Sequence, residues 1–259
     1  MPDWLRRTLF GVLFGVVVIG GTLVHPLVMT ALWALIGLLI AVEFGRNEQM
    51  HPAARMLLAA GVVGTCLWAA ASHAAAFVPW IAGGMAWLAV SVFLHWPDTW
   101  KGWRLWWWNA LFLWGVMGLA DPAGDFQPAM LLAVIFTVWT HDVAAYAGGN
   151  LFKGPKLAPS LSPGKRWSGA LSGWLGGWAI GWLIFQWMTT LPPATSLASA
   201  AAAVAGAFIG DLIQSAWKRT LGIKDSGRIL PGHGGILDRM DALMAAAPLA
   251  YLVIRWMQS

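Results

Sequence analysis

The chain alternates long apolar runs with short polar breaks, and the length of the runs predicts helices that cross a membrane. A helix needs about 20 mostly apolar residues to span a bilayer, within a working range of about 17–25. The pattern therefore predicts an all-α, polytopic bundle of about nine transmembrane helices, over residues 8–24, 27–44, 55–73, 77–95, 104–120, 127–147, 169–190, 195–217 and 242–258. The fifth run is the weakest, because Lys101 and Arg104 precede it and Asp121 ends it.

Composition supports a membrane protein and restricts its partners. Hydrophobic residues make up 59% of the chain and charged residues 10%, whereas a soluble domain carries about 25% charged residues. The net charge of +5 favours anionic partners such as lipid headgroups, phosphates and nucleotides. We expect membrane lipids as partners and no nucleic acid. The single cysteine, Cys66, excludes an intrachain disulfide and a cysteine-based metal site.

The distribution of Lys and Arg predicts the orientation of the chain. With the N-terminus in the cytoplasm, 15 of the 16 basic residues fall in cytoplasmic segments, and Arg255 is the exception. The first run follows Arg6 and Arg7, and we interpret it as a retained signal anchor. The predicted cytoplasmic loops at 148–168 and 218–241 are long, and long polar loops between spans often carry function. We therefore divide the chain into N-terminal transmembrane helices (1–125) and a C-terminal catalytic region (126–259).

Acidic residues inside apolar runs are the first candidates for chemistry. Asp211 lies in the run AFIGDLIQSAWKR, and a carboxylate at the bilayer centre costs about 2.5–3.5 kcal/mol on insertion scales. Gln214 and Ser215 share its helical face, which predicts a polar stripe facing a cavity. The alternative is a buried Asp paired with Lys or Arg for packing. Asp142 is a second such acid and shares a face with Tyr146.

The segment GHGGILDRMD adds a possible metal and phosphate site. Asp238 and Asp241, together with Asp211, offer the oxygen ligands that Mg²⁺ prefers. The glycines at 232–235 would let backbone N–H groups approach a phosphate; the alternative is an ordinary glycine turn before a capped helix. With the basic residues near 153–166 and 218–239, these acids favour phosphoryl or nucleotidyl transfer at the cytoplasmic face. For Lys153 and Lys156, simple anchoring of the helices is a strong alternative.

Two stretches resemble a known family. Residues 215–241 read SAWKRTLGIKDSGRILPGHGGILDRMD and closely resemble the motif of phosphatidate cytidylyltransferases, also called CDP-diacylglycerol synthases: S-x-x-K-R-x4-K-D-x-G-x-x-x-P-x-H-G-G-x-x-D-R-x-D. Residues 141–169 resemble the family's D-x-x-A-Y-x-x-G followed by L-x-P-x-x-S-P-x-K. Both matches lie in the C-terminal half. The N-terminal half resembles the family only as a set of apolar spans.

The resemblance implies that CTP and phosphatidic acid react to give CDP-diacylglycerol and pyrophosphate, with Mg²⁺ and with a second cation left open. It implies a multi-pass protein of the bacterial cytoplasmic (inner) membrane with its active site on the cytoplasmic side, and a homodimer is compatible with it. On this basis the expected catalytic residues are Asp211, Asp238, Lys218 and Arg239; the expected metal ligands are Asp211, Asp238 and Asp241; and the expected substrate-binding residues are Ser162, Lys165, Arg219, Lys224, His233 and Asp142.

Several positions depart from the family pattern and keep alternatives open. The family usually has Glu at Gln214, Thr or Ser at Arg166, Glu or Gln at Ser168, Arg or Lys at Asn150, and Ser at Ala242. A paralogue that transfers the cytidylyl group to another lipid phosphate would account for them. A third possibility is a transporter or lipid-binding protein that uses the same polar cavity without chemistry. Metal-dependent turnover of CTP separates this possibility from the two enzymes.

Overall fold

The computed structural model describes residues 3–71, 99–120, 126–229 and 234–258, which are mainly helical. The chain forms two compact units. The first unit comprises Met1–Phe126 and Ile223–Met240, and the second comprises Gln127–Gly222 and Asp241–Ser259.

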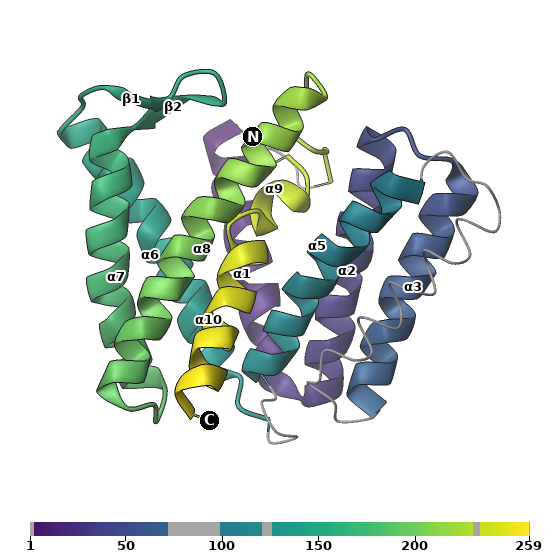
Figure 1. Cartoon of the computed structure of the whole chain (residues 1–259), viewed down its shortest axis with the longest axis horizontal. Coiled ribbons are helices and arrows are strands. Elements are labelled where there is room, and N and C mark those ends of the chain that lie inside the picture. Colours follow the sequence, from purple (N-terminus) through teal and green to yellow (C-terminus); the bar gives the residue numbers. More distant parts are fainter. Residues whose placement is uncertain (1–2, 72–98, 121–125, 230–233, 259) are drawn as a thin grey trace. The chain divides into compact units, whose positions relative to one another are not determined.

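The first unit is built around one buried helix. Its helices are α1 (Asp3–Val24), α2 (Pro26–Asn47), α3 (Pro52–Ala71), α5 (Thr99–Ala120) and the short α9 (Leu237–Met240) (Figure 1). α2 packs against each of the other four. It begins at Pro26, where a missing N–H costs no helical bond, and His25 accepts a hydrogen bond from the Leu27 N–H through Nδ1 at 3.2 Å. Trp33 of α2 is fully buried and meets Phe112 of α5 edge to face.

The second unit contains two packed helix pairs and one hairpin. Its elements are α6 (Ala129–Leu151), β1 (Lys156–Ala158), β2 (Ser162–Arg166), α7 (Trp167–Met188), α8 (Pro193–Thr220) and α10 (Leu243–Gln258). α6 packs along α7, and α8 packs along α10. β1 and β2 form an antiparallel hairpin between the end of α6 and the start of α7, visible at the top of Figure 1.

Glycines bring α6 and α7 into close contact. Gly169, Gly173, Gly177 and Gly181 recur at every fourth position of α7, and all four are buried. A Cβ atom on Gly177 would lie 2.8 Å from the Cβ atom of His141 on α6. Small residues at this spacing let two helix backbones approach closely, which stabilises helix pairs in a lipid environment. His141 is buried against these glycines.

The prediction of an all-α fold is confirmed for most of the described residues, but it is wrong for one segment, which forms a short hairpin. Eight of the nine predicted spans fall on described helices, while 77–95 lies outside the described residues. Four of the described helical stretches are long and apolar enough to cross a membrane: Pro26–Asn47, Ala129–Leu151, Pro193–Thr220 and Leu237–Gln258. The segment 148–168, expected to be a loop, contains the end of α6 and the hairpin. These strands of three and five residues are too short to show the alternation that reveals a strand in a sequence.

Candidate functional site

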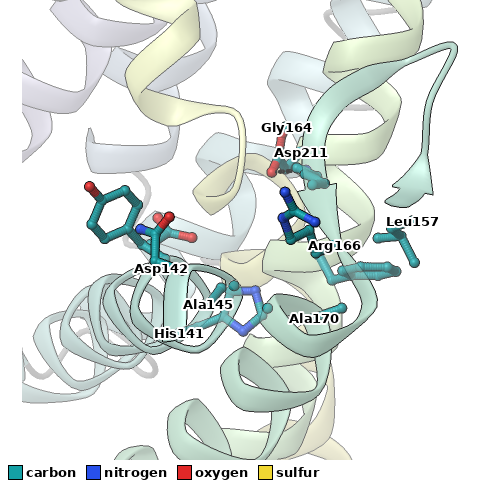
Figure 2. A pocket seen from close by; sticks show the side chains of 14 residues that line it. His141, Asp142, Ala145, Leu157, Gly164, Arg166, Ala170 and Asp211 are labelled. Atoms are coloured by element: carbon teal, nitrogen blue, oxygen red, sulfur yellow. Dashed lines mark hydrogen bonds and ion pairs between the residues drawn. The ribbon is translucent and has the colours of Figure 1, made fainter. Parts of the chain in front are cut away.

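A pocket of about 330 Å³ lies in the second unit, between α6, α7, α8 and the hairpin. Figure 2 shows His141 and Asp142 from α6, Arg166 from β2 and Asp211 from α8 around it. Its polar lining comprises His141, Asp142, Tyr146, Asn150, Lys165, Arg166 and Asp211. The pocket thus combines two carboxylates and two cations, and it brings together three of the expected site residues: Asp142, Lys165 and Asp211.

An ion pair between Lys165 and Asp211 is the central feature of this pocket. Lys165 Nζ donates to Asp211 Oδ2, and Ser215 Oγ, one helical turn further along α8, donates to Asp211 Oδ1 at 3.3 Å. Asp211 therefore lines the pocket and is also paired with a cation, as the alternative predicted, while the pocket lining does not extend to Gln214 and Ser215. The Lys165 and Asp211 side chains remain 27% and 34% exposed. A ligand can reach them, and an incoming phosphate or cation would compete for one partner of the pair.

Further charges surround Asp211 within the second unit. Asp142, Asp211 and Lys218 lie close enough to Asp241 to act electrostatically on its carboxylate, and Asp241 Oδ1 accepts a hydrogen bond from the Ala242 N–H at 2.8 Å. Among the residues that the structure describes, no three acidic, histidine or cysteine side chains converge as a ready-made metal site. Two neighbouring carboxylates still fit Mg²⁺, which proteins commonly bind through one or two carboxylates, water and substrate phosphates.

The hairpin that carries Lys165 is fixed by hydrogen bonds to its backbone. Arg219 Nε donates to the Leu161 carbonyl at 3.0 Å, and Arg166 Nη1 donates to the Gly154 carbonyl at 2.7 Å. Gly154 has a φ of +97°, a conformation that glycine adopts without strain. The structure places Arg219 Nε on the hairpin turn, and its expected contact with a substrate phosphate stays a prediction. Ser162 lies in β2 opposite Ala158. These hydrogen bonds to the hairpin backbone therefore fix the position of Lys165 at the pocket.

The other expected site residues belong to the first unit. Asp238 Oδ2 accepts hydrogen bonds from the Ser226 N–H at 2.7 Å and from the Gly235 N–H at 2.9 Å, which closes the turn before α9. Lys224 and Arg239 are exposed on the same segment, and His233 lies outside the described residues. The metal role of Asp238 stays a prediction.

The glycine turn at 232–235 has one described N–H group, that of Gly235, with a carboxylate of the protein as its partner, and phosphate contacts of the turn stay a prediction. Gly235 N–H donates to Asp238, and the Ile236 and Leu237 N–H groups donate to Glu43 of α2. Carboxylates of the protein thus accept from three consecutive N–H groups, and the first of them, Gly235, belongs to the glycine turn. Glu43 was missed in the sequence, because its partners follow it in the chain by 183–194 residues.

The comparisons with known proteins agree with the resemblance. A family model described as the cytidylyltransferase family matches residues 5–257. The chain belongs to this family. A phosphatidate cytidylyltransferase of Brucella suis is 40% identical over 163 residues, which cover 59% of this chain and 58% of the relative. The phosphatidate cytidylyltransferase of Pseudomonas aeruginosa is 46% identical over 129 residues, which cover 49% of this chain and 47% of the relative. That of Haemophilus influenzae is 40% identical over 124 residues, which cover 46% of this chain and 43% of the relative. The chain thus spans about half the length of the curated relatives it matches.

Three of the five departures of this cytidylyltransferase-family chain fall in two different places. Gln214 is 4% exposed, and its Nε2 meets Met244 Sδ at 3.5 Å between α8 and α10. The missing acid therefore belongs to a packed helix contact outside the pocket lining. Asn150 and Arg166 both line the pocket. Where the resemblance implies a cation at position 150, this chain supplies one from position 166.

Proposed function

We propose that this protein transfers the cytidylyl group of CTP to phosphatidic acid and releases pyrophosphate, which makes CDP-diacylglycerol for phospholipid biosynthesis. The observation that carries the proposal is the partly exposed Lys165–Asp211 pair in a pocket rich in charge. Membership of the cytidylyltransferase family supports it. So do the relatives that are named phosphatidate cytidylyltransferases.

The proposed reaction is an in-line displacement. An oxygen of the lipid phosphate attacks the α-phosphorus of CTP, and the bond from that phosphorus to the bridging oxygen breaks. The electron pair leaves with pyrophosphate. A phosphate monoester has a second pKa of about 6 and is mostly ionised near pH 7, so the nucleophile needs no general base. Catalysis then depends on positioning and on charge neutralisation, which Lys165 and Arg166 would provide at the pocket.

Asp211 and Asp241 would hold Mg²⁺, and Asp238 is a further candidate ligand. The metal would neutralise charge on the phosphates and make the departure of pyrophosphate easier. The hard oxygen donors of these carboxylates suit this ion. A second cation is compatible with the same acids.

We further propose a bilayer orientation that brings both substrates to the site. The N-terminus and the residues of the pocket would face the cytoplasm, and about nine helices would cross the inner membrane. The distribution of basic residues supports this orientation. CTP would then enter from water, while the lipid phosphate would reach the site from the membrane surface.

A second candidate is transfer to a different lipid phosphate. Asn150 and Arg166, both in the pocket lining, favour it, because they change the charge pattern next to the substrate. Purified protein with labelled CTP, Mg²⁺ and a panel of lipid phosphates would decide between them. Product from phosphatidic acid supports the first proposal, and product from another lipid phosphate alone selects the second. No product from any member of the panel contradicts both.

A further inference from the structure

Glu43 is a buried acid near the end of α2, a helix long and apolar enough to cross a membrane. Its side chain is 4% exposed and accepts three hydrogen bonds from a distant part of the chain. Oε1 accepts from the Ile236 N–H at 3.1 Å, and Oε2 accepts from the Leu237 N–H and the Ser226 Oγ–H, both at 2.9 Å. An ionisable residue at such a site indicates a function, and here its partners identify which segment it serves.

The surroundings of Glu43 fit a carboxylate closely. All three groups are donors in these bonds, which matches an ionised carboxylate that only accepts. Cβ atoms on Gly227 or Gly235 would overlap the Glu43 carboxylate, so only glycine leaves room for it. Asn47, one helical turn further along α2, donates from Nδ2 to the Ser226 carbonyl at 2.7 Å. Two side chains of α2 therefore hold one segment by its backbone.

That segment, of which the structure describes residues 226–229 and 234–238, carries part of the motif and ends at Asp238. Asp238 Oδ2 accepts from the N–H groups of Ser226 and Gly235. The N–H groups of Ser226 and Gly235 are thus held by Asp238, and those of Ile236 and Leu237 by Glu43 of α2. Loss of Glu43 would leave two buried N–H groups without their acceptor, which destabilises this conformation. The conformation seen here would then lose its main external support.

We propose that Glu43 is a positioning residue that sets the conformation of residues 226–229 and 234–238 and, through them, the place of Asp238. This proposal rests on the proposed function, in which Asp238 of the segment is a candidate ligand of Mg²⁺. Glu43 itself contacts no substrate on this account. Loss of Glu43 should lower turnover and should speed hydrogen exchange in this segment alone.

The test uses the full-length protein in detergent with the variant Glu43→Gln, which keeps the shape and removes one acceptor. Its amide group must face at least one backbone N–H, so we expect kcat to fall about tenfold or more, with a smaller change in KM for CTP. Hydrogen exchange followed by mass spectrometry should show faster exchange over residues 234–240 and unchanged exchange in α6. Glu48→Gln is the matched control, because Glu48 is 8% exposed at the same helix end and pairs with Arg104 of α5 at 3.7 Å. It should match wild type over segment 226–238.

Wild-type kcat in Glu43→Gln, or unchanged exchange over 234–240, overturns the proposal. If Glu43→Gln does not fold, Ser226→Ala takes its place, since it removes one of the three bonds and leaves the acid buried. We expect faster exchange and a lower kcat for Ser226→Ala as well, and no change in either overturns the proposal. A wild-type protein that makes no product refutes the proposed function alone, because hydrogen exchange still measures the effect of Glu43.

Discussion

Gly169→Ala tests whether the close contact of α6 and α7 shapes the pocket. The new Cβ atom would lie 2.7 Å from the carbonyl oxygen of Ala145 and 3.3 Å from the Cα atom of Gly149. Both neighbours are backbone atoms, so neither can rotate away. The shorter distance is about 0.7 Å inside ordinary contact, which begins at 3.4 Å, and the two helices must separate to relieve it.

The energetic cost follows from two opposing terms. Overpacking a tight contact costs about 1–3 kcal/mol, and the better helix propensity of Ala returns about 0.5–1 kcal/mol. We expect a net loss of about 1–2 kcal/mol, which lowers the melting temperature by about 2–8 °C. Because Gly169 also lines the pocket, turnover should fall with stability.

Thermal unfolding of the purified protein in detergent measures this effect. The matched control is Gly64→Ala in α3, where the added Cβ atom would meet nothing within 4 Å. This control should be as stable as wild type or slightly more stable. A Gly169→Ala protein with wild-type melting temperature and wild-type turnover would refute the argument that this contact is tight and shapes the site.

Three further changes probe the site. Gln214→Glu should lower stability by about 1–3 kcal/mol, because it places a carboxylate against the Met244 thioether, and it should give no increase in turnover. Thermal unfolding measures the stability and the CTP assay measures turnover, and higher turnover would contradict the packing role. Arg219→Ala should release the hairpin turn at Leu161, because its hydrogen bond to that carbonyl is lost. We expect KM for CTP to rise about two- to tenfold and proteolysis within residues 156–166 to become faster. Unchanged proteolysis would contradict the anchoring role. Chelation with EDTA should abolish turnover and added Mg²⁺ should restore it, while full activity in EDTA would contradict the metal proposal.

The sequence predicts most of the helices because their signals are local. α8 follows an apolar run that starts after a proline pair and ends at Lys218 and Arg219, and α2 starts at Pro26. Asp211 and Asp142 stood out as acids within apolar runs, and both line the pocket. In each case, length, proline or an isolated charge carries the information.

The parts that the sequence did not predict depend on contacts between distant residues. Nothing near Glu43 indicates that its partners lie at positions 226–237. Likewise, Arg219 looks like any other cation near a phosphate site until the hairpin places the Leu161 carbonyl beside it. The glycine spacing on α7 was available in the sequence as a repeat of small residues at every fourth position, and it would have identified the α6–α7 contact.

The most direct test of the central proposal compares wild type with Asp211→Asn in one assay. Purified protein in detergent receives phosphatidic acid, labelled CTP and Mg²⁺, and CDP-diacylglycerol is measured over time. We predict product from wild type and a loss of at least about a hundredfold in Asp211→Asn, because Asn keeps the shape of Asp211 but lacks the charge that holds the metal. Wild-type rates in a folded Asp211→Asn protein, or no product from wild type, would contradict the account.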